Sequence, residues 1–149
     1  MRQQKELSSS RLRPSASRLV RSARVAHLAT ADKDGRPHVI PICYVFDGKD
    51  IYSPIDEKPK RATPLKLKRV RNIEANPYVA VVVDCYDENW KKLAYVLIFG
   101  RAKILTRGSR HNKAVLLLRR KYPQYRRMAI HERPMICVRP SHTTSWGNF

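Results

Sequence analysis

Two Asp-Gly pairs, at residues 34–35 and 47–48, constrain the fold more than any other feature of the sequence. An Asp-Gly pair between apolar runs is typical of a tight hairpin turn, because these residues tolerate a positive φ angle. The runs at 25–30, 36–46 and 51–53 therefore predict a three-stranded antiparallel meander. Apolar residues occupy both faces of the middle run, so neither face is expected to meet water. Such a strand belongs in a barrel or under a partner.

The rest of the chain contains more predicted strands than helices. Thr63 and Pro64 form a helix start, with the threonine as N-cap, and predict a helix from Pro64 to Ala75. A second helix is predicted from a Ser109 cap to about Tyr122. A short helix at 18–23 and strands at 78–85, 93–99 and 135–138 complete the pattern, and residues 100–105 either continue the second of these strands or start another through a bulge. Because only two helices lie between strands, the pattern predicts a mainly β fold: a closed or nearly closed barrel flanked by helices, and not a doubly wound parallel sheet.

The length of 149 residues corresponds to one domain, which we assign to residues 18–149. Residues 1–17 are rich in Arg and Ser and poor in acids, which predicts a flexible basic tail. An organellar transit peptide is the alternative, but no amphipathic apolar stripe supports it. The apolar runs are too short to cross a bilayer. Cys43, Cys85 and Cys137 are far apart and lie in apolar runs, which favours buried thiols in a cytoplasmic protein and no metal site.

The charge of the chain is strongly positive, with 31 Lys and Arg against 12 Asp and Glu, or +19. Such a field implies an anionic partner. One cluster, Lys58, Lys60 and Arg61 with the Thr63 hydroxyl, directly precedes the predicted helix, where unpaired backbone N–H groups favour an anion. These residues are therefore a candidate phosphate site, and a solvated basic loop is an equally weighted alternative.

A second basic cluster, at residues 119–127, alternates cations with two tyrosines. This composition is found in grooves that bind single-stranded nucleic acid, and also at the basic end of an ordinary helix. The composition keeps nucleic-acid binding as an alternative function. It is not the first choice, because no RNA-recognition signature or zinc finger accompanies the cluster.

Other catalytic patterns are missing from the sequence. The five histidines have no metal-ligand spacing, and there is no nucleophile elbow or phosphate-binding glycine loop. Hydrolase and kinase functions are thereby excluded. Hydride transfer by a bound cofactor needs no acid and base pair from the protein, so it suits this chain.

Several segments together resemble one family. Residues 23–30, 34–42 and 47–52 resemble the opening hairpins of the pyridoxamine 5'-phosphate oxidase-like split barrels. Residues 56–60, 67–77 and 81–90, the Lys121–Tyr125 segment and Trp146 are similar to one branch, the probable F420-dependent flavin/deazaflavin oxidoreductases. The resemblance implies a split β-barrel of the FMN-binding type, an antiparallel Greek-key barrel with flanking helices. Residues 94–100 depart from it, because this branch is expected to carry tryptophan there, which affects the shape of the substrate pocket.

The resemblance also implies a cofactor in a groove at a homodimer interface. Its ring is expected beside Val39, Ile40, Pro41, Ile42, Tyr52 and Ser53. Its phosphate is expected at Lys58 and Lys60, with Arg61 or Thr63, where the charge argument also places an anion. Trp146 reaches the ring from the partner subunit by analogy, or is a packing residue.

The function implied is hydride transfer between F420 and a small organic substrate, with FMN as the alternative cofactor. The charge of +19 favours F420, since F420 carries a phosphodiester and a tail of glutamates. Tyr44 and His38 are candidate proton donors, each with a structural role as the alternative. A non-catalytic barrel that binds flavin or haem, or a basic nucleic-acid-binding protein, is the alternative function.

Overall fold

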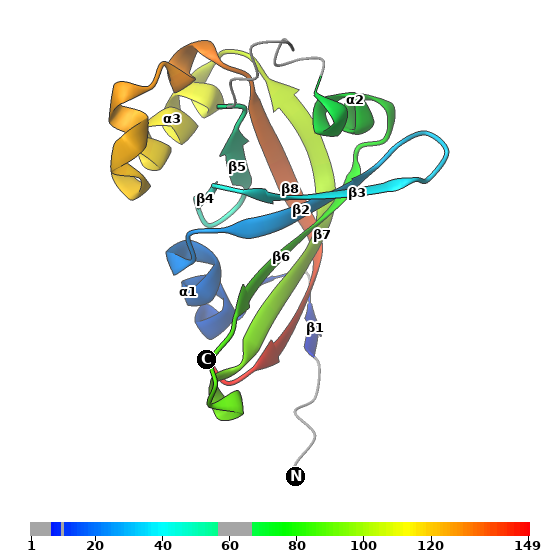
Figure 1. Cartoon of the computed structure of the whole chain (residues 1–149), viewed down its shortest axis with the longest axis vertical. Helices are drawn as coiled ribbons and strands as arrows, with labels where there is room; N and C mark the ends of the chain where they lie inside the picture. Colours follow the sequence, from blue (N-terminus) through cyan, green and yellow to red (C-terminus); the bar gives the residue numbers. More distant parts are fainter. Residues whose placement is uncertain (1–6, 10, 57–66) are drawn as a thin grey trace.

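One antiparallel sheet is the framework of the protein (Figure 1), and the computed structural model describes residues 7–9, 11–56 and 67–149. Its strands are β1 (Leu7–Ser9), β2 (Ala26–Ala31), β3 (Pro37–Ile42), β4 (Val45–Phe46), β5 (Ile51–Pro54), β6 (Tyr78–Cys85), β7 (Ala94–Leu105) and β8 (Met135–Gly147). They pair in the order β3-β2-β6-β7-β8-β5-β4, and β1 also pairs with β8. Three α-helices accompany the sheet: α1 (Pro14–Ser22), α2 (Lys68–Ala75) and α3 (Ser109–Lys121). Short 3₁₀ helices cover Trp90–Lys92, Pro123–Arg127 and Ile130–Glu132.

The two end strands of the sheet, β3 and β4, are neighbours in the chain. Only Cys43 and Tyr44 separate them, so Ile42 and Val45 lie within about 11 Å of one another, given 3.8 Å between successive Cα atoms. The sheet must therefore curl until its opposite ends nearly meet. In the described residues the chain itself bridges these ends, and no strand ladder does. This arrangement is a split barrel, as the resemblance implied, and we call residues 43–44 the gap.

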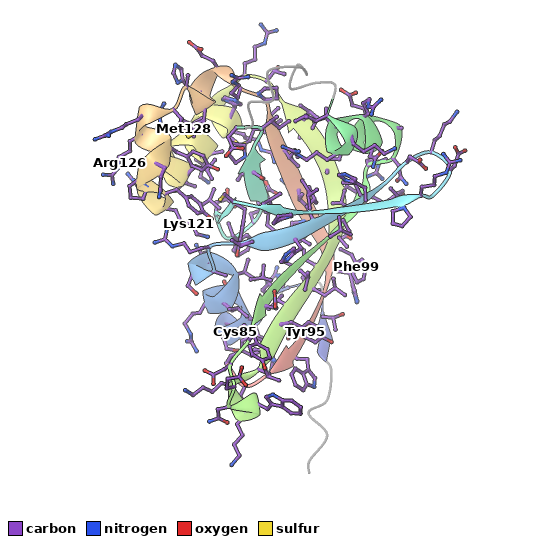
Figure 2. All side chains as sticks on the ribbon, viewed as in Figure 1. Cys85, Tyr95, Phe99, Lys121, Arg126 and Met128 are labelled. Carbon is purple, nitrogen blue, oxygen red and sulfur yellow. The ribbon has the colours of Figure 1, made fainter. Side chains whose placement is uncertain are left out.

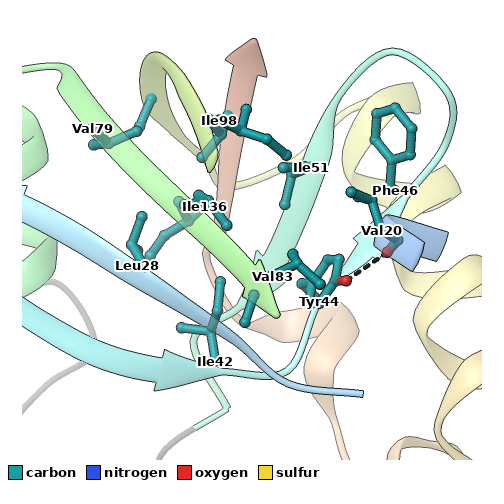
Figure 3. Packing of buried hydrophobic residues seen from close by; sticks show 14 of the residues in the cluster. Val20, Leu28, Ile42, Tyr44, Phe46, Ile51, Val79, Val83, Ile98 and Ile136 are labelled. Atoms are coloured by element: carbon teal, nitrogen blue, oxygen red, sulfur yellow. Dashed lines mark hydrogen bonds between the residues drawn. The ribbon is translucent and has the colours of Figure 1, made fainter. Parts of the chain in front are cut away.

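Alternate side chains of each strand point into the barrel or away from it. Phe99 on β7 projects outward (Figure 2), whereas its neighbour Ile98 is fully buried inside (Figure 3). Val20 of α1 and Val70 of α2 are also fully buried and belong to the same interior cluster. These two helices therefore contribute buried side chains to the barrel core.

A second apolar cluster lies outside the barrel, between α3 and the strands β4, β5 and β8. Leu118 of α3 packs there with Tyr52 and Cys137, and all three are almost fully buried. The outer surface of the barrel is thus covered on this side by α3 and the short helices that follow it.

The structure confirms the predicted hairpins and corrects several boundaries. Gly35 and Gly48 have φ angles of 79° and 98°, as the predicted turns require. The strand predicted over 36–46 breaks at the gap and becomes β3 and β4. The last strand, predicted over 135–138, continues to Gly147, because its second half, although polar, pairs with β7.

The predicted helix starts also need correction. Leu67 has an extended backbone at the N-cap of α2, so a continuous helix from Pro64 is excluded. Thr63 lies outside the described residues. The N-cap of α3 is Gly108 rather than Ser109, and α1 begins at Pro14, within the segment assigned to the tail.

Two further expectations differ from the structure. Residues 7–9, also assigned to the tail, pair with β8 as strand β1. Among the cysteines, Cys137 is buried and Cys43 half-buried, but Cys85 is exposed at the end of β6, so the prediction of three buried thiols is wrong there.

Tyr122, which follows α3, holds the gap in place. Its hydroxyl accepts a hydrogen bond from the backbone N–H of Tyr44 at 3.1 Å. The same hydroxyl lies 2.8 Å from the carbonyl oxygen of Arg24 and 2.9 Å from that of Tyr44, so these two acceptors share its single proton. Tyr44 is itself fully buried and donates its hydroxyl to the carbonyl of Val20 in α1. One phenol therefore ties together the start of β2, the gap and α3.

We expect Tyr122→Phe to lower the free energy of unfolding by roughly 1–3 kcal/mol, because the buried N–H of Tyr44 loses its partner. Urea denaturation followed by circular dichroism measures this change. Tyr86→Phe, which removes an exposed hydroxyl, is the matched control and should change stability by less than about 0.5 kcal/mol. Equal effects of the two substitutions would contradict the role given to Tyr122.

Candidate functional site

The outer face of β3, β2, β6, β7 and the second half of β8 carries many apolar side chains. Val39, Tyr78 and Phe99 are 60%, 65% and 41% exposed. Strand pairing places further outward side chains beside them: Ala29, Pro41, Ala80, Val82, Tyr95, Leu97 and Trp146. We call these ten residues the outer patch. Exposed apolar surface that is continuous over several strands marks an interaction site.

The strand register makes the outer patch continuous. Val39 lies opposite Ala29, Ala29 opposite Ala80, and Ala80 opposite Phe99. These residues form one row across four strands, from the edge strand β3 to β7. The patch therefore begins at the strand beside which the family resemblance implies the cofactor ring.

The four residues predicted on β3 fall on two different faces. Val39 and Pro41 point outward and are exposed, whereas Ile42 is buried and Ile40 is half-buried against the barrel interior. Val39 and Pro41 can therefore contact a ligand on the outer face through their side chains, and Ile40 and Ile42 only through their backbone.

The backbone of β3 is itself available to a ligand. In the described residues β3 pairs with β2 on one side and with no strand on the other. Alternate residues of β3 therefore direct their backbone polar groups away from the sheet, as at any edge strand, but Pro37 and Pro41 offer only C=O groups because proline has no N–H. A planar heterocycle with its own N–H and C=O groups fits such an edge.

Tyr52 and Ser53 present no side chain to the outer patch. Tyr52 is 1% exposed and packs under α3, while the Ser53 hydroxyl donates to the carbonyl of Cys43 at 2.8 Å. Ser53 thus supports the gap from β5. Because both side chains are buried, neither is available to a ligand on the outer face of β3.

Trp146 belongs to the outer patch but lies far from Val39. Its ring stacks on Tyr95 at 6.0 Å between centroids, with 19° between the ring planes. Strands β3 and β8 are four strand spacings apart, or about 19 Å along the sheet at 4.8 Å per spacing. One chain therefore cannot place both Val39 and Trp146 on one small ring.

The predicted phosphate ligands Lys58, Lys60, Arg61 and Thr63 lie outside the described residues. The chain enters this segment from Asp56, whose carboxylate accepts a hydrogen bond of 2.6 Å from the hydroxyl of Tyr125.

Tyr44 is not available as a proton donor. It is fully buried, its hydroxyl is bonded to the carbonyl of Val20, and burial raises its pKa well above the ordinary value. His38 is half-buried on the inner side of β3, and its Nδ1 has no hydrogen-bond partner in the part of the chain that the structure describes. Nearby on the same face, Thr30 accepts a hydrogen bond of 3.0 Å from Asn72 of α2.

The tyrosines of the basic cluster at 119–127 are core residues. Tyr122 and Tyr125 are 8% and 4% exposed and meet edge to face at 5.4 Å. Arg119 donates to the carbonyl of Tyr125 at 3.2 Å. These rings therefore offer no platform on which nucleic-acid bases can stack, and this cluster forms the basic end of a helix.

The sequence predicts no role of its own for Lys121 beyond its place in the cluster at 119–127 and in the segment that resembles the family. Its Nζ is buried, has no hydrogen-bond partner among the described residues, and lies 4.1 Å from the ring centroid of Tyr44. Burial, with the nearby Arg24, lowers the pKa of Lys121 to about 8. In the sequence it stands among the four other cations of the cluster at 119–127, so no local signal distinguishes it from a solvated lysine.

Two further properties bear on the kind of site. No group of three or more His, Cys, Asp or Glu side chains within 7–9, 11–56 and 67–149 is placed to hold a metal ion. Likewise, none of the helices described is both long and apolar enough to span a bilayer.

Comparison with known proteins identifies the family. A model of the family described as pyridoxamine 5'-phosphate oxidase matches residues 12–147. The chain belongs to the pyridoxamine 5'-phosphate oxidase family. The family assignment made from the sequence is thereby confirmed, together with the split-barrel fold.

Solved structures with this fold cover most of the chain. A conserved hypothetical protein from Mycobacterium tuberculosis is 22% identical, with a TM-score of 0.72 over 93% of this chain and 88% of that one. A FAD-binding protein from Mesorhizobium loti is 20% identical, with a TM-score of 0.68 over 94% and 96%. An F420 reductase is 25% identical, with a TM-score of 0.65 over 89% and 98%. The comparison with curated proteins gave no match.

We expect the difference in free energy of unfolding between Lys121→Met and the wild type to depend on pH. The pKa of Lys121 is about 8 in the folded chain and 10.5 in the reference state, so the unfolded chain binds more protons between these values. The charged lysine therefore destabilises the fold below pH 8, and this cost diminishes as the pH rises toward 10. The variant should be more stable than the wild type at pH 7, with a smaller difference at pH 9.5.

Urea unfolding at both pH values measures this difference in stability. Lys33→Met, in the exposed hairpin turn, is the control for loss of one surface charge and should show no comparable change with pH. If Lys121→Met differs from the wild type by the same free energy of unfolding at both pH values, the burial of the Lys121 amine is contradicted.

Proposed function

We propose that the protein is a homodimeric oxidoreductase that uses F420, or FMN as the alternative, to pass a hydride to or from a small organic substrate. The observation that carries this proposal is the apolar outer patch that starts at the open edge of β3 in a protein of this family. The F420 reductase and the FAD-binding protein of the same fold bind cofactors of the class proposed.

The residues of β3 suit the ring of such a cofactor. Val39 and Pro41 supply an exposed apolar surface, and the open edge of the strand supplies C=O acceptors together with N–H donors from residues other than Pro37 and Pro41. The ring of F420 or FMN is planar and carries N–H and C=O groups along one side. When bound, the cofactor supplies the hydride chemistry, and the chain supplies binding and alignment.

The distance between Val39 and Trp146 supports the proposed dimer, if Trp146 contacts the ring as the family resemblance implies. Because these residues are four strands apart in one chain, Trp146 of the partner subunit would have to complete the ring site on β3. A second copy packed on the outer patch would also remove Phe99 and its apolar neighbours from water. The same contact would exclude water from the reacting carbons, since the ring would lie between the two copies.

The charge of the chain favours F420 over FMN in this proposal. FMN has one phosphate, whereas F420 has a phosphodiester and several carboxylates. A chain of net charge +19 has cations in excess of those needed for one phosphate. Lys58 and Lys60, with Arg61 or Thr63, remain the proposed phosphate ligands.

We expect the double substitution Lys58→Ala and Lys60→Ala to weaken F420 and FMN binding by more than tenfold. Each lysine removed takes away a charge-assisted hydrogen bond, which contributes roughly 1.5–3 kcal/mol. Fluorescence titration of the purified protein with each cofactor measures the affinities. Lys91→Ala with Lys92→Ala removes the same charge from an exposed 3₁₀ helix and is the matched control.

The absorption spectrum of protein purified from a host that makes both cofactors gives an independent result. A flavin or deazaflavin band supports the proposal. A Soret band would instead indicate a haem-binding barrel, and affinity for nucleic acid that falls steeply with salt would indicate the basic nucleic-acid-binding alternative.

For the dimer, we expect Phe99→Asp to weaken association by at least tenfold, because a carboxylate would be buried in an apolar contact. Light scattering after size-exclusion chromatography, over a range of protein concentrations, measures the mass. Leu116→Asp is the matched control, since Leu116 is 60% exposed on α3, away from the outer patch. A wild-type protein that is monomeric at every concentration would refute the dimer.

A further inference from the structure

A basic cleft of about 450 Å³ lies between the end of β7, the start of β8 and the first turn of α3. Its lining includes four cationic side chains and one thiol: Arg101, Lys103, Arg110, Arg139 and Cys137. The four cations come from three elements, β7, α3 and β8. None of these residues belongs to the sites considered above.

A buried carboxylate fixes two of these cations. Asp50, which is 2% exposed, accepts hydrogen bonds from Arg110 at 2.7 Å and from Arg139 at 2.9 Å and through its Nε. Burial alone would raise the pKa of Asp50, but these two guanidinium groups lower it below its ordinary value. Asp50 is therefore ionised at neutral pH and holds both arginines in fixed positions.

The other two cations have no acidic partner in the described residues. Arg101 lies 5.1 Å from the ring centroid of Tyr78, which orients its guanidinium. Ion pairs within 11–56 and 67–149 involve neither Arg101 nor Lys103. The cleft thus contains four positive charges and one negative charge, and its excess is not neutralised by the described chain.

The remaining wall of the cleft does not supply a negative charge. Cys137 is almost fully buried, and burial raises the pKa of its thiol, so it is neutral at pH 7. Arg110 contacts its Sγ at 3.0 Å. Arg110 and Arg139 nevertheless remain accessible, because their side chains are 36% and 51% exposed. Donors not used by Asp50 are therefore available to a ligand.

We propose that this cleft binds the phosphate group of a small molecule, separately from the cofactor phosphate site proposed at Lys58 and Lys60. Guanidinium groups match phosphate oxygens in pairs, and two of the three arginines are already positioned by Asp50, so little side-chain entropy is lost on binding. A phosphate dianion neutralises most of the excess charge of three. The cleft volume is within the range for small-molecule sites, so it accommodates a phosphorylated metabolite rather than a bare ion alone.

The test uses inorganic phosphate as the probe, titrated calorimetrically into the purified protein at constant ionic strength in chloride buffer. The starting protein carries Lys58→Ala and Lys60→Ala, so that binding at the proposed cofactor site is removed. We expect this protein to bind phosphate saturably. Adding Arg101→Gln and Lys103→Gln should weaken that binding by at least tenfold.

A matched control adds Lys33→Gln and Lys91→Gln to the same starting protein, which removes two exposed positive charges elsewhere. Unchanged phosphate affinity in this control supports the cleft. The proposal is overturned if the starting protein no longer binds phosphate, or if the control loses as much affinity as the cleft variant. Because the readout is phosphate binding without F420 or FMN, failure of the proposed redox function leaves this result unaffected, and the reverse also holds.

Discussion

Closure of the sheet is the constraint on which the rest of the structure depends. The end strands β3 and β4 are two residues apart in the chain, so a sheet of this strand order cannot remain open. Tyr122 stabilises the gap because its hydroxyl accepts a hydrogen bond from the backbone N–H of Tyr44 and donates to the carbonyl of Arg24. The same region buries Lys121 against the ring of Tyr44. The end of α3 is therefore part of the barrel's closure rather than an accessory helix.

Closure also decides which surfaces remain free. The interior is filled by the sheet's own side chains together with α1 and α2, and α3 covers the side of β4 and β5. The outward residues of β3, β2, β6 and β7 remain exposed in a single chain, Val39 and Phe99 among them. This apolar outer face, which adjoins an open strand edge, is where we propose that a planar cofactor and a second copy of the chain bind.

The positive charge of the chain has several structural environments rather than one. Near α3 the cations surround buried tyrosines, and Arg119 bonds to backbone carbonyls. Around Asp50 two arginines share one buried carboxylate and, with Arg101 and Lys103, line a cleft. Net charge alone does not separate these environments, because it depends on composition and not on which elements meet.

The sequence by itself determined the hairpin turns at Gly35 and Gly48, the apolar character of both faces of residues 36–46, and the family. These properties depend on local backbone preference or on residues that are close together in the chain. Tertiary structure alone decided that β8 continues to Gly147, since residues 139–147 are polar and gain their strand partner from β7. It also decided that Val39 and Trp146 are four strands apart, and that Asp50 meets Arg110 and Arg139. These contacts join residues 60 and 89 positions apart, and no local pattern encodes them because they arise only when the sheet closes.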